Sequence, residues 1–156
     1  MHHKPSRKDI HSYLTDLSLA VLATVGSDNT PYTATVFFTT DEDLNFYLMT
    51  KSSTQKFLNL EHNKNVALAT IDAHTIKTVQ VKGTVEKITD TDITTRIVEA
   101  LAEKSVVGGI SYWPPPLSKI QKGEIVVLKI TPTWLRYADY SNPSEKEEEV
   151  FHQIIP

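Results

Sequence analysis

The sequence predicts a mainly β protein, an antiparallel barrel with a few connecting helices. Six or more short segments are rich in β-branched and aromatic residues, and turn-forming residues separate them at short spacing. Helical periodicity occurs only in occasional connectors, which is not the regular strand–helix alternation of a parallel sheet. The glycine-rich phosphate loops GxGxxG and GxxxxGKS/T do not occur, so dinucleotide-binding and P-loop folds lose their main support.

The opening segments predict one helix and three strands. Ser6 can cap a short first helix, because apolar residues follow it at helical spacing. Strands are expected at residues 19–25, 32–40 and 44–49, with turns at the polar stretches between them. We expect these three strands to pair in chain order as an antiparallel meander.

The middle of the chain predicts two helices and two strands. One helix begins near Ser52 or Ser53, and strands at 66–71 and 75–88 follow it. Gly83 lies inside the second of these strands, where a glycine typically marks a bulge or bend. A further helix is expected at residues 91–104, with Asp90 as its cap and an apolar stripe along one face.

The last third predicts a long loop and two strands. Residues 105–123 contain two adjacent glycines and three consecutive prolines, and irregular loops of this length are usually functional or interfacial. Strands are expected at residues 123–130 and 134–140, separated by Pro132. We expect one domain over residues 1–141, followed by an acidic C-terminal tail over residues 142–156.

The composition excludes several classes of protein. The chain of 156 residues is 40% hydrophobic and 22% charged, as in a globular domain. A net charge of -3 gives no general attraction to nucleic acid or to an anionic membrane, and no apolar run reaches the ~20 residues of a membrane span. The absence of cysteine excludes thiolate catalysis and cysteine-based metal sites. We expect a cytoplasmic protein with no metal site, no nucleic-acid partner and no membrane partner.

The segment from Thr50 to Lys56 carries the clearest chemical signal. It has four hydroxyl groups and two lysines between the end of a strand and the start of a helix. Ser52 and Gln55 fit a capping box, which alone accounts for both of them. Lys51 and Lys56 are harder to explain, because a helix start carries a partial positive charge and prefers acidic residues. Either this is a capped surface helix with solvated lysines, or it is a phosphate-binding helix start.

A family resemblance favours the phosphate site. Residues 22–72, LATVGSDNTPYTATVFFTTDEDLNFYLMTKSSTQKFLNLEHNKNVALATID, resemble the pyridoxamine 5′-phosphate oxidase-like family of FMN-binding split β-barrels, which are six-stranded and antiparallel. The later segments VKGTVEKI (81–88) and VVLKITPTWLRY (126–137) are similar to that family as well. The resemblance covers roughly residues 8 to 140, and it implies an FMN-binding oxidoreductase that acts on a small-molecule substrate.

The resemblance also implies which residues bind the cofactor. The FMN phosphate would lie on the helix start, and the flavin ring would lie along the second strand. A position on the long strand would contact the flavin across a homodimer interface. The residues implied are Thr50, Lys51, Ser52, Ser53, Thr54 and Lys56 for the phosphate, Thr35, Val36, Phe37 and Phe38 for the ring, and Thr78 on the long strand. Val36 and Phe38 can instead be core residues, since neighbouring strand residues face opposite sides.

Two departures from the family pattern leave other functions open. Gln55 stands where the vitamin B6 oxidases have an arginine, and the acidic C-terminal segment has no match to their basic, substrate-gripping residues. Pyridoxamine phosphate is therefore not the expected substrate. The alternatives are a deazaflavin-dependent reductase, or a non-catalytic flavin- or haem-binding protein, on the same barrel. Trp113 and Trp134 are candidates for flavin contact, or for packing in the core or interface.

Overall fold

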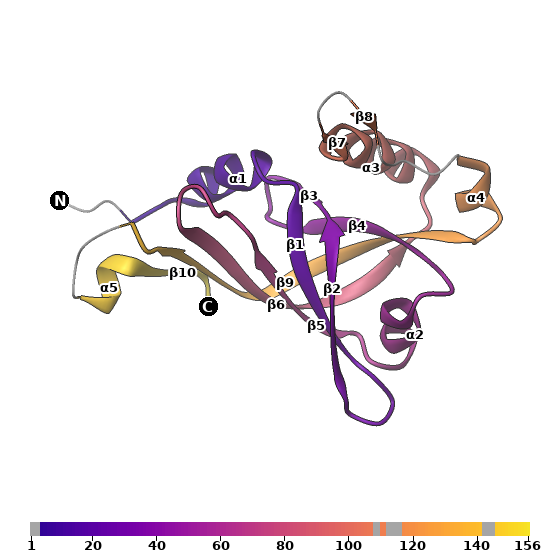
Figure 1. Cartoon of the computed structure of the whole chain (residues 1–156), viewed down its shortest axis with the longest axis horizontal. Helices are drawn as coiled ribbons and strands as arrows, with labels where there is room; N and C mark the ends of the chain where they lie inside the picture. The colour runs from indigo at the N-terminus through magenta and orange to yellow at the C-terminus, as the bar shows by residue number, and fades with distance from the viewer. Residues whose placement is uncertain (1–3, 108–109, 112–116, 142–145) are drawn as a thin grey trace.

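The protein folds as a curled antiparallel sheet with a few helices around it (Figure 1). The structure is a computed structural model that describes residues 4–107, 110–111, 117–141 and 146–156. Seven strands follow one another in the order β2-β1-β5-β6-β9-β4-β3, and β10 also pairs with β9. The expected mainly β barrel is confirmed. The described sheet has eight strands where six were expected, and one of them, β3, has two residues.

The two ends of this strand order are adjacent in the sequence. β2 (Pro31–Phe37) pairs with β1 (Leu19–Val25), whereas β3 (Thr39–Thr40) pairs with β4 (Phe46–Lys51). Phe38 lies between β2 and β3, and its side chain is fully buried beside Phe46, with the ring centres 5.4 Å apart. One stretch of chain therefore closes the barrel by changing partners at Phe38.

The expected three-strand meander is wrong for this reason. β4 pairs with β3 and with β9 (Ile125–Asp139), and it is not a ladder neighbour of β2. The remaining antiparallel ladders join β1 to β5 (Asn65–Thr70), β5 to β6 (Lys77–Ile88), and β6 to β9. A gap is left between β2 and β4, where the barrel is split.

β9 is one strand of 15 residues, not the two strands expected on either side of Pro132. Pro132 is tolerated because the ladder with β6 shifts register there: Lys82 pairs with Trp134, and Gly83 pairs with Pro132. On the other edge of β9, β4 pairs as far as Ile130 and β10 begins at Leu135, so no neighbour on that edge needs a proline N–H. A proline at a bulge bends this strand without ending it.

Five described helices connect and cover the strands. They are α1 (Arg7–Thr15), α2 (Gln55–His62), α3 (Thr91–Lys104), α4 (Leu117–Gln121) and α5 (Glu147–Val150). Ser6 caps α1 through a capping box with Asp9, and the Asp90 side chain caps α3 as expected. Among the described residues, no helix is long and apolar enough to cross a membrane.

The stretch expected to be an irregular loop contains two short strands, β7 (Val106–Val107) and β8 (Ile110–Ser111), besides α4. In Figure 1, β7 and β8 lie beside α3, outside the barrel. The segment expected to be an acidic tail contributes β10 (Phe151–Ile155), which pairs with β9. Ile154 and Ile155 of this strand pack against the main core.

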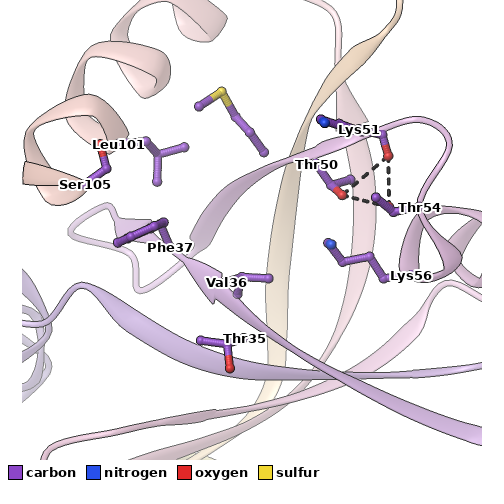
Figure 2. A pocket seen from close by; sticks show the side chains of 10 residues that line it. Thr35, Val36, Phe37, Thr50, Lys51, Thr54, Lys56, Leu101 and Ser105 are labelled. Atoms are coloured by element: carbon purple, nitrogen blue, oxygen red, sulfur yellow. Dashed lines mark hydrogen bonds between the residues drawn. The ribbon is translucent and has the colours of Figure 1, made fainter. Parts of the chain in front are cut away.

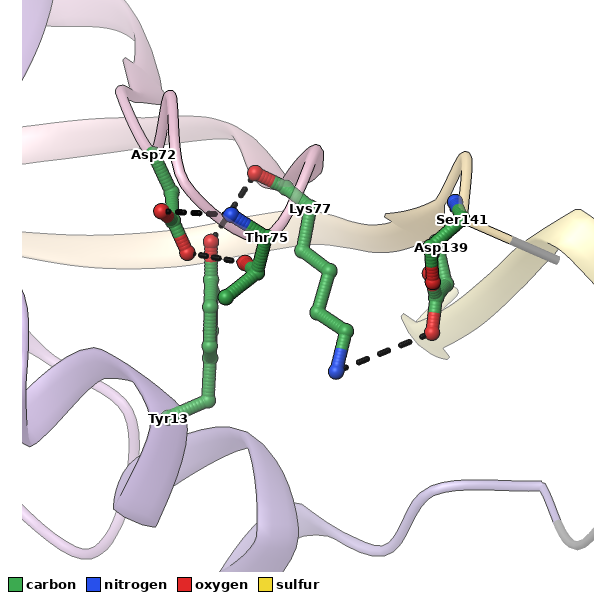
Figure 3. A network of polar contacts seen from close by, with 6 residues as sticks. All are labelled: Tyr13, Asp72, Thr75, Lys77, Asp139 and Ser141. Atoms are coloured by element: carbon green, nitrogen blue, oxygen red, sulfur yellow. Dashed lines mark hydrogen bonds and ion pairs between the residues drawn. The ribbon is translucent and has the colours of Figure 1, made fainter.

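The core fills the inside of the barrel, and a polar network holds one end of it. The Tyr13 hydroxyl on α1 donates to the Lys77 carbonyl oxygen at 2.9 Å, and Lys77 pairs with Asp139 at 3.8 Å (Figure 3). Asp72 accepts hydrogen bonds from Thr75 in the turn before β6. Burial of the Tyr13 hydroxyl raises its pKa well above the usual range, so it stays a donor at every physiological pH. α1 is thereby fixed over the turn that joins β5 and β6.

Candidate ligand-binding cleft

A cleft of about 340 Å³ opens where the barrel is split. Its walls come from β2, from β4 with the start of α2, and from the C-terminal end of α3. The lining residues are Thr35, Val36, Phe37, Met49, Thr50, Lys51, Thr54, Lys56, Leu101 and Ser105. Figure 2 shows Thr50, Lys51, Thr54 and Lys56 at one end, and Phe37, Leu101 and Ser105 at the other. The cleft is thus polar and cationic at one end and apolar at the other.

Hydroxyl groups at the polar end are held by hydrogen bonds within the turn. The Thr50 and Thr54 hydroxyl oxygens are 2.9 Å apart, and the Thr54 hydroxyl donates to the Lys51 carbonyl oxygen, also at 2.9 Å. These contacts span the turn between β4 and α2, so they fix the relation between the strand end and the helix start. Thr50 is buried, whereas Thr54 is partly exposed. The turn is therefore organised around the hydroxyls that face the cleft.

The start of α2 differs from the expected capping box. Thr54, not Ser52, occupies the N-cap position, and no side chain accepts a hydrogen bond from the first turn. The Ser52 backbone N–H and hydroxyl both donate to the Glu124 carbonyl oxygen, at 2.9 and 3.3 Å. Gln55 instead donates to Asn59 at 2.8 Å. The first turn of α2 contains no acidic residue, so its backbone N–H groups and partial positive charge favour an anion.

Lys56 adds a full positive charge to this helix start. Its side chain is half-buried, and burial alone lowers the pKa of its ammonium group below the usual value. Within the described part of the chain, no ion pair joins Lys56 to a carboxylate, and no acidic residue lines the cleft. A partly desolvated cation without a protein counter-ion is costly, and a bound anion would offset that cost.

The other end of the cleft can accept a flat apolar group. Val36 is 5% exposed, yet it lines the cleft next to Phe37 on β2. Met49, on β4, and Phe37 pack against the small cluster formed by Ile97, Val98, Leu101 and Val127. Within the described ranges, no strand pairs with β2 on the side of the split, so its backbone can meet the polar edge of a ring.

The structure brings together seven of the residues that the sequence pointed to. They are Thr35, Val36, Phe37, Thr50, Lys51, Thr54 and Lys56. Phe38 is in the core, Ser52 is held by Glu124, and Ser53 is exposed; none of them lines the cleft. Thr78 lies on β6, where its hydroxyl donates to the Thr70 carbonyl oxygen at 3.2 Å.

The two tryptophans were the other candidates. Trp134 contacts Lys82 and Arg136, whose charged groups lie 5.1 and 5.5 Å from its ring centre, and it does not line this cleft. Trp113 lies outside the described residues. Three lining residues were not expected from the sequence: Met49, Leu101 and Ser105. The apolar stripe of the α3 segment includes Leu101, but a helical stripe does not tell which neighbour it faces.

The fold and the cleft define the class of protein: a split β-barrel with a lysine-bearing, uncapped helix start beside an apolar wall. The model of the pyridoxamine 5′-phosphate oxidase family matches residues 6–139 of the sequence. The chain therefore belongs to this family. A comparison with curated protein sequences found no match.

Solved structures with the same fold include proteins of different kinds. A conserved hypothetical protein from Mycobacterium tuberculosis is 20% identical, with 91% of each chain covered and a TM-score of 0.70. An F420 reductase is 24% identical, with 80% of this chain and 94% of that one covered and a TM-score of 0.61. HutZ, the haem storage protein from Vibrio cholerae, is 15% identical, with 80% of this chain and 87% of that one covered and a TM-score of 0.59. These similarities show the fold.

Proposed function

We propose that the protein binds FMN in this cleft and is a flavin-dependent oxidoreductase that acts on a small molecule. The observation that carries the proposal is the half-buried Lys56 ammonium, which has no acidic partner among the described residues, at a helix start that no side chain caps. The family match supports a phosphorylated, ring-shaped ligand.

The two ends of the cleft suit the two ends of FMN. Lys51, Lys56 and the hydroxyls of Thr50 and Thr54 would hold the phosphate, together with the first N–H groups of α2. The flavin ring would lie along Thr35, Val36 and Phe37 of β2. Ser52 and Ser53 belong to the same turn, and they would contribute to binding by maintaining the conformation of that turn.

The flavin would supply the redox chemistry, and the chain would supply position and electrostatics. Lys51 and Lys56 would orient the ligand by fixing its anionic end, while Phe37 and Leu101 would exclude water from its apolar face. The chain would therefore select its substrate by the shape of the space that remains above the ring.

A second candidate is a deazaflavin-dependent reductase on the same barrel, which the F420 reductase among the similar structures favours. A non-catalytic haem- or flavin-binding protein is a third, favoured by HutZ. No histidine is among the described residues that line the cleft, whereas two lysines are, and the lysines favour a phosphorylated cofactor over haem.

The working form would be a homodimer with the flavin site at the subunit interface and Thr78 contributed by the second copy. Static light scattering at micromolar concentration should give twice the mass of the 17.5 kDa chain. A mass of one chain at that concentration would rule out the dimer.

Cofactor binding is tested by adding FMN, removing the excess by gel filtration and recording the visible spectrum. We expect the wild type to keep flavin absorbance and Lys56→Ala to lose most of it. Lys87→Ala, an exposed lysine on β6 outside this cleft, is the matched control and should behave as wild type. A wild type that keeps no flavin would contradict the proposal, and F420 and haem would be tried next by the same procedure.

A further inference from the structure

The wall of the cleft formed by α3 packs through a small apolar cluster of its own. Ile97, Val98 and Leu101 of α3 form an apolar cluster with Val127 that is separate from the main core. In Figure 1, α3 lies outside the barrel, beside β7 and β8. Leu101 and Ser105 at its C-terminal end line the cleft, so the position of this end sets how wide the cleft is.

Lys104 connects this end of α3 to a distant part of the chain. Its ammonium group donates to the Thr15 carbonyl oxygen and, at 2.6 Å, to the Leu17 carbonyl oxygen. Thr15 is the last residue of α1, and the last turn of α1 has no basic residue of its own. The carbonyl groups at a helix C-terminus lack partners within the helix and carry partial negative charge. Lys104 thus caps α1 from another helix.

The chemistry of Lys104 also favours a fixed geometry. Its side chain is half-buried, and burial lowers the pKa of its ammonium group while Asp16 nearby acts to raise it. Hydrogen bonds from a charged donor in a partly dry environment are stronger than neutral ones. Leu101 stands one turn before Lys104 on the same helix face, so the anchor and the cleft wall move together.

We propose that Lys104 is a positioning residue, which sets the width of the cleft by tying the C-terminal end of α3 to the end of α1 and the residues that follow it. The choice of FMN as the ligand in the test rests on the proposed function; the structural role does not. The role is open to a measurement without ligand, because the chain has two methionines, Met1 and Met49, and Met49 lines the cleft within the cluster that contains Leu101.

The variants are Lys104→Leu, which removes both hydrogen bonds of the ammonium group, and Lys104→Arg, which keeps a charged donor. Arg96→Leu is the matched control, because it removes an exposed cation from the same helix. Methyl-labelled methionine NMR of the ligand-free proteins is expected to show a shifted Met49 signal in Lys104→Leu and unshifted signals in the other two. FMN and riboflavin are both expected to bind Lys104→Leu about tenfold more weakly, the equivalent of about one charge-assisted hydrogen bond.

Equal losses of affinity for FMN and riboflavin in Lys104→Leu would show that the substitution acts on binding of the flavin ring and not of the phosphate. An unshifted Met49 signal with unchanged affinities in Lys104→Leu would overturn the proposal. If the wild type binds neither flavin, the proposed function fails, and the Met49 signal alone then decides the role of Lys104. If Lys104→Leu does not unfold cooperatively, Lys104→Ala takes its place, and the same two outcomes decide.

Discussion

Lys56 would be a residue that is unfavourable for folding and, under the proposed function, useful for binding. In the free protein its ammonium group is partly desolvated, and burial is the sole cause of its lowered pKa. A group that loses proton affinity on folding destabilises the folded state while it is charged. A phosphate dianion at the start of α2 would turn this cost into attraction.

Replacing Lys56 by methionine should therefore raise the stability of the free protein and weaken FMN binding. We expect the free energy of unfolding to rise by no more than about 0.5 kcal/mol, because the ammonium remains partly solvated. This increase in the free energy of unfolding should be constant near neutral pH. It should shrink as the pH rises toward 10.5, the ordinary lysine pKa, because the wild-type lysine then loses its charge. Urea unfolding at several pH values measures this, and a less stable variant at pH 7 would contradict it.

The charge of the phosphate gives a second prediction at this scale. A phosphate monoester takes its second negative charge near pH ~6, so the negative charge that faces Lys51 and Lys56 would increase across this pH. FMN affinity should therefore increase from pH 5 to pH 7, whereas riboflavin affinity should not. Fluorescence titration of both ligands across this range checks the difference. Parallel pH profiles for the two would place the phosphate away from Lys51 and Lys56.

Among the elements, the start of α2 decides the character of the site. Two hydrogen bonds to the Glu124 carbonyl oxygen hold Ser52 next to the end of β4. The N-cap of α2 is therefore Thr54, two residues after Ser52. The helix start is thereby placed at the split of the barrel, with no acidic residue in its first turn. Its partial charge remains available to a ligand.

An acidic residue at Ser53 should compete with such a ligand. Ser53 is exposed and directly precedes the N-cap, so Ser53→Asp places a carboxylate beside the helix start. The variant should be more stable than Ser53→Asn, its uncharged isostere, by about 0.3–1 kcal/mol, and should bind FMN more weakly than Ser53→Asn. Thermal unfolding and fluorescence titration of the pair test this. Equal affinities would mean that the phosphate does not use this helix end.

Elements with local signals were predictable from the sequence. The apolar run of residues 19–25 is β1, and Asp90 caps a helix with the expected bounds, because continuous apolar runs and caps act over a few residues. The sequence also singled out Lys51 and Lys56, whose charges oppose the polarity of a helix start, and both line the cleft; their phosphate binding stays a prediction. Each of these signals lies within a few residues of the element that it predicts.

Features that depend on distant residues were not predictable. The capping box predicted at Ser52 was wrong because Ser52 instead donates hydrogen bonds to the Glu124 carbonyl oxygen, 72 residues away. The break at Pro132 was wrong because the register shift opposite Gly83 accommodates the proline. Met49, Leu101 and Ser105 meet in the cleft through tertiary packing, and Lys104 reaches a carbonyl group 89 positions away.

At the scale of the whole molecule, β9 holds the barrel together. It pairs with β6 along nearly its full length and with β4 and β10 on its other edge. At Gly83 of β6, a Cβ atom would lie 2.5 Å from the Thr131 carbonyl oxygen of β9. The bend of the sheet depends on the absence of a side chain there.

Gly83→Ala should therefore destabilise the protein by roughly 1–3 kcal/mol, because backbone must move to relieve the contact. Thr84→Ala, at the next and exposed position of β6, is the control and should change the free energy of unfolding by less than about 0.5 kcal/mol. Chemical denaturation of both variants gives the comparison. A Gly83→Ala variant as stable as the wild type would show that the two strands can separate there at no cost.

The pairing of β9 also determines when the cleft can form during synthesis. β4, which carries Thr50 and Lys51, has just the two-residue β3 as a ladder partner until β9 is made, some 75 residues later. β1 and β2 can pair early as a local hairpin, but pairing of β4 with β9 closes a long loop and is slow. A nascent chain therefore presents the edge of β4 unpaired until residues 125–130 have left the ribosome. We therefore expect the cleft to be one of the last parts of the protein to be completed, and FMN bound as proposed would stabilise the chain only after that point.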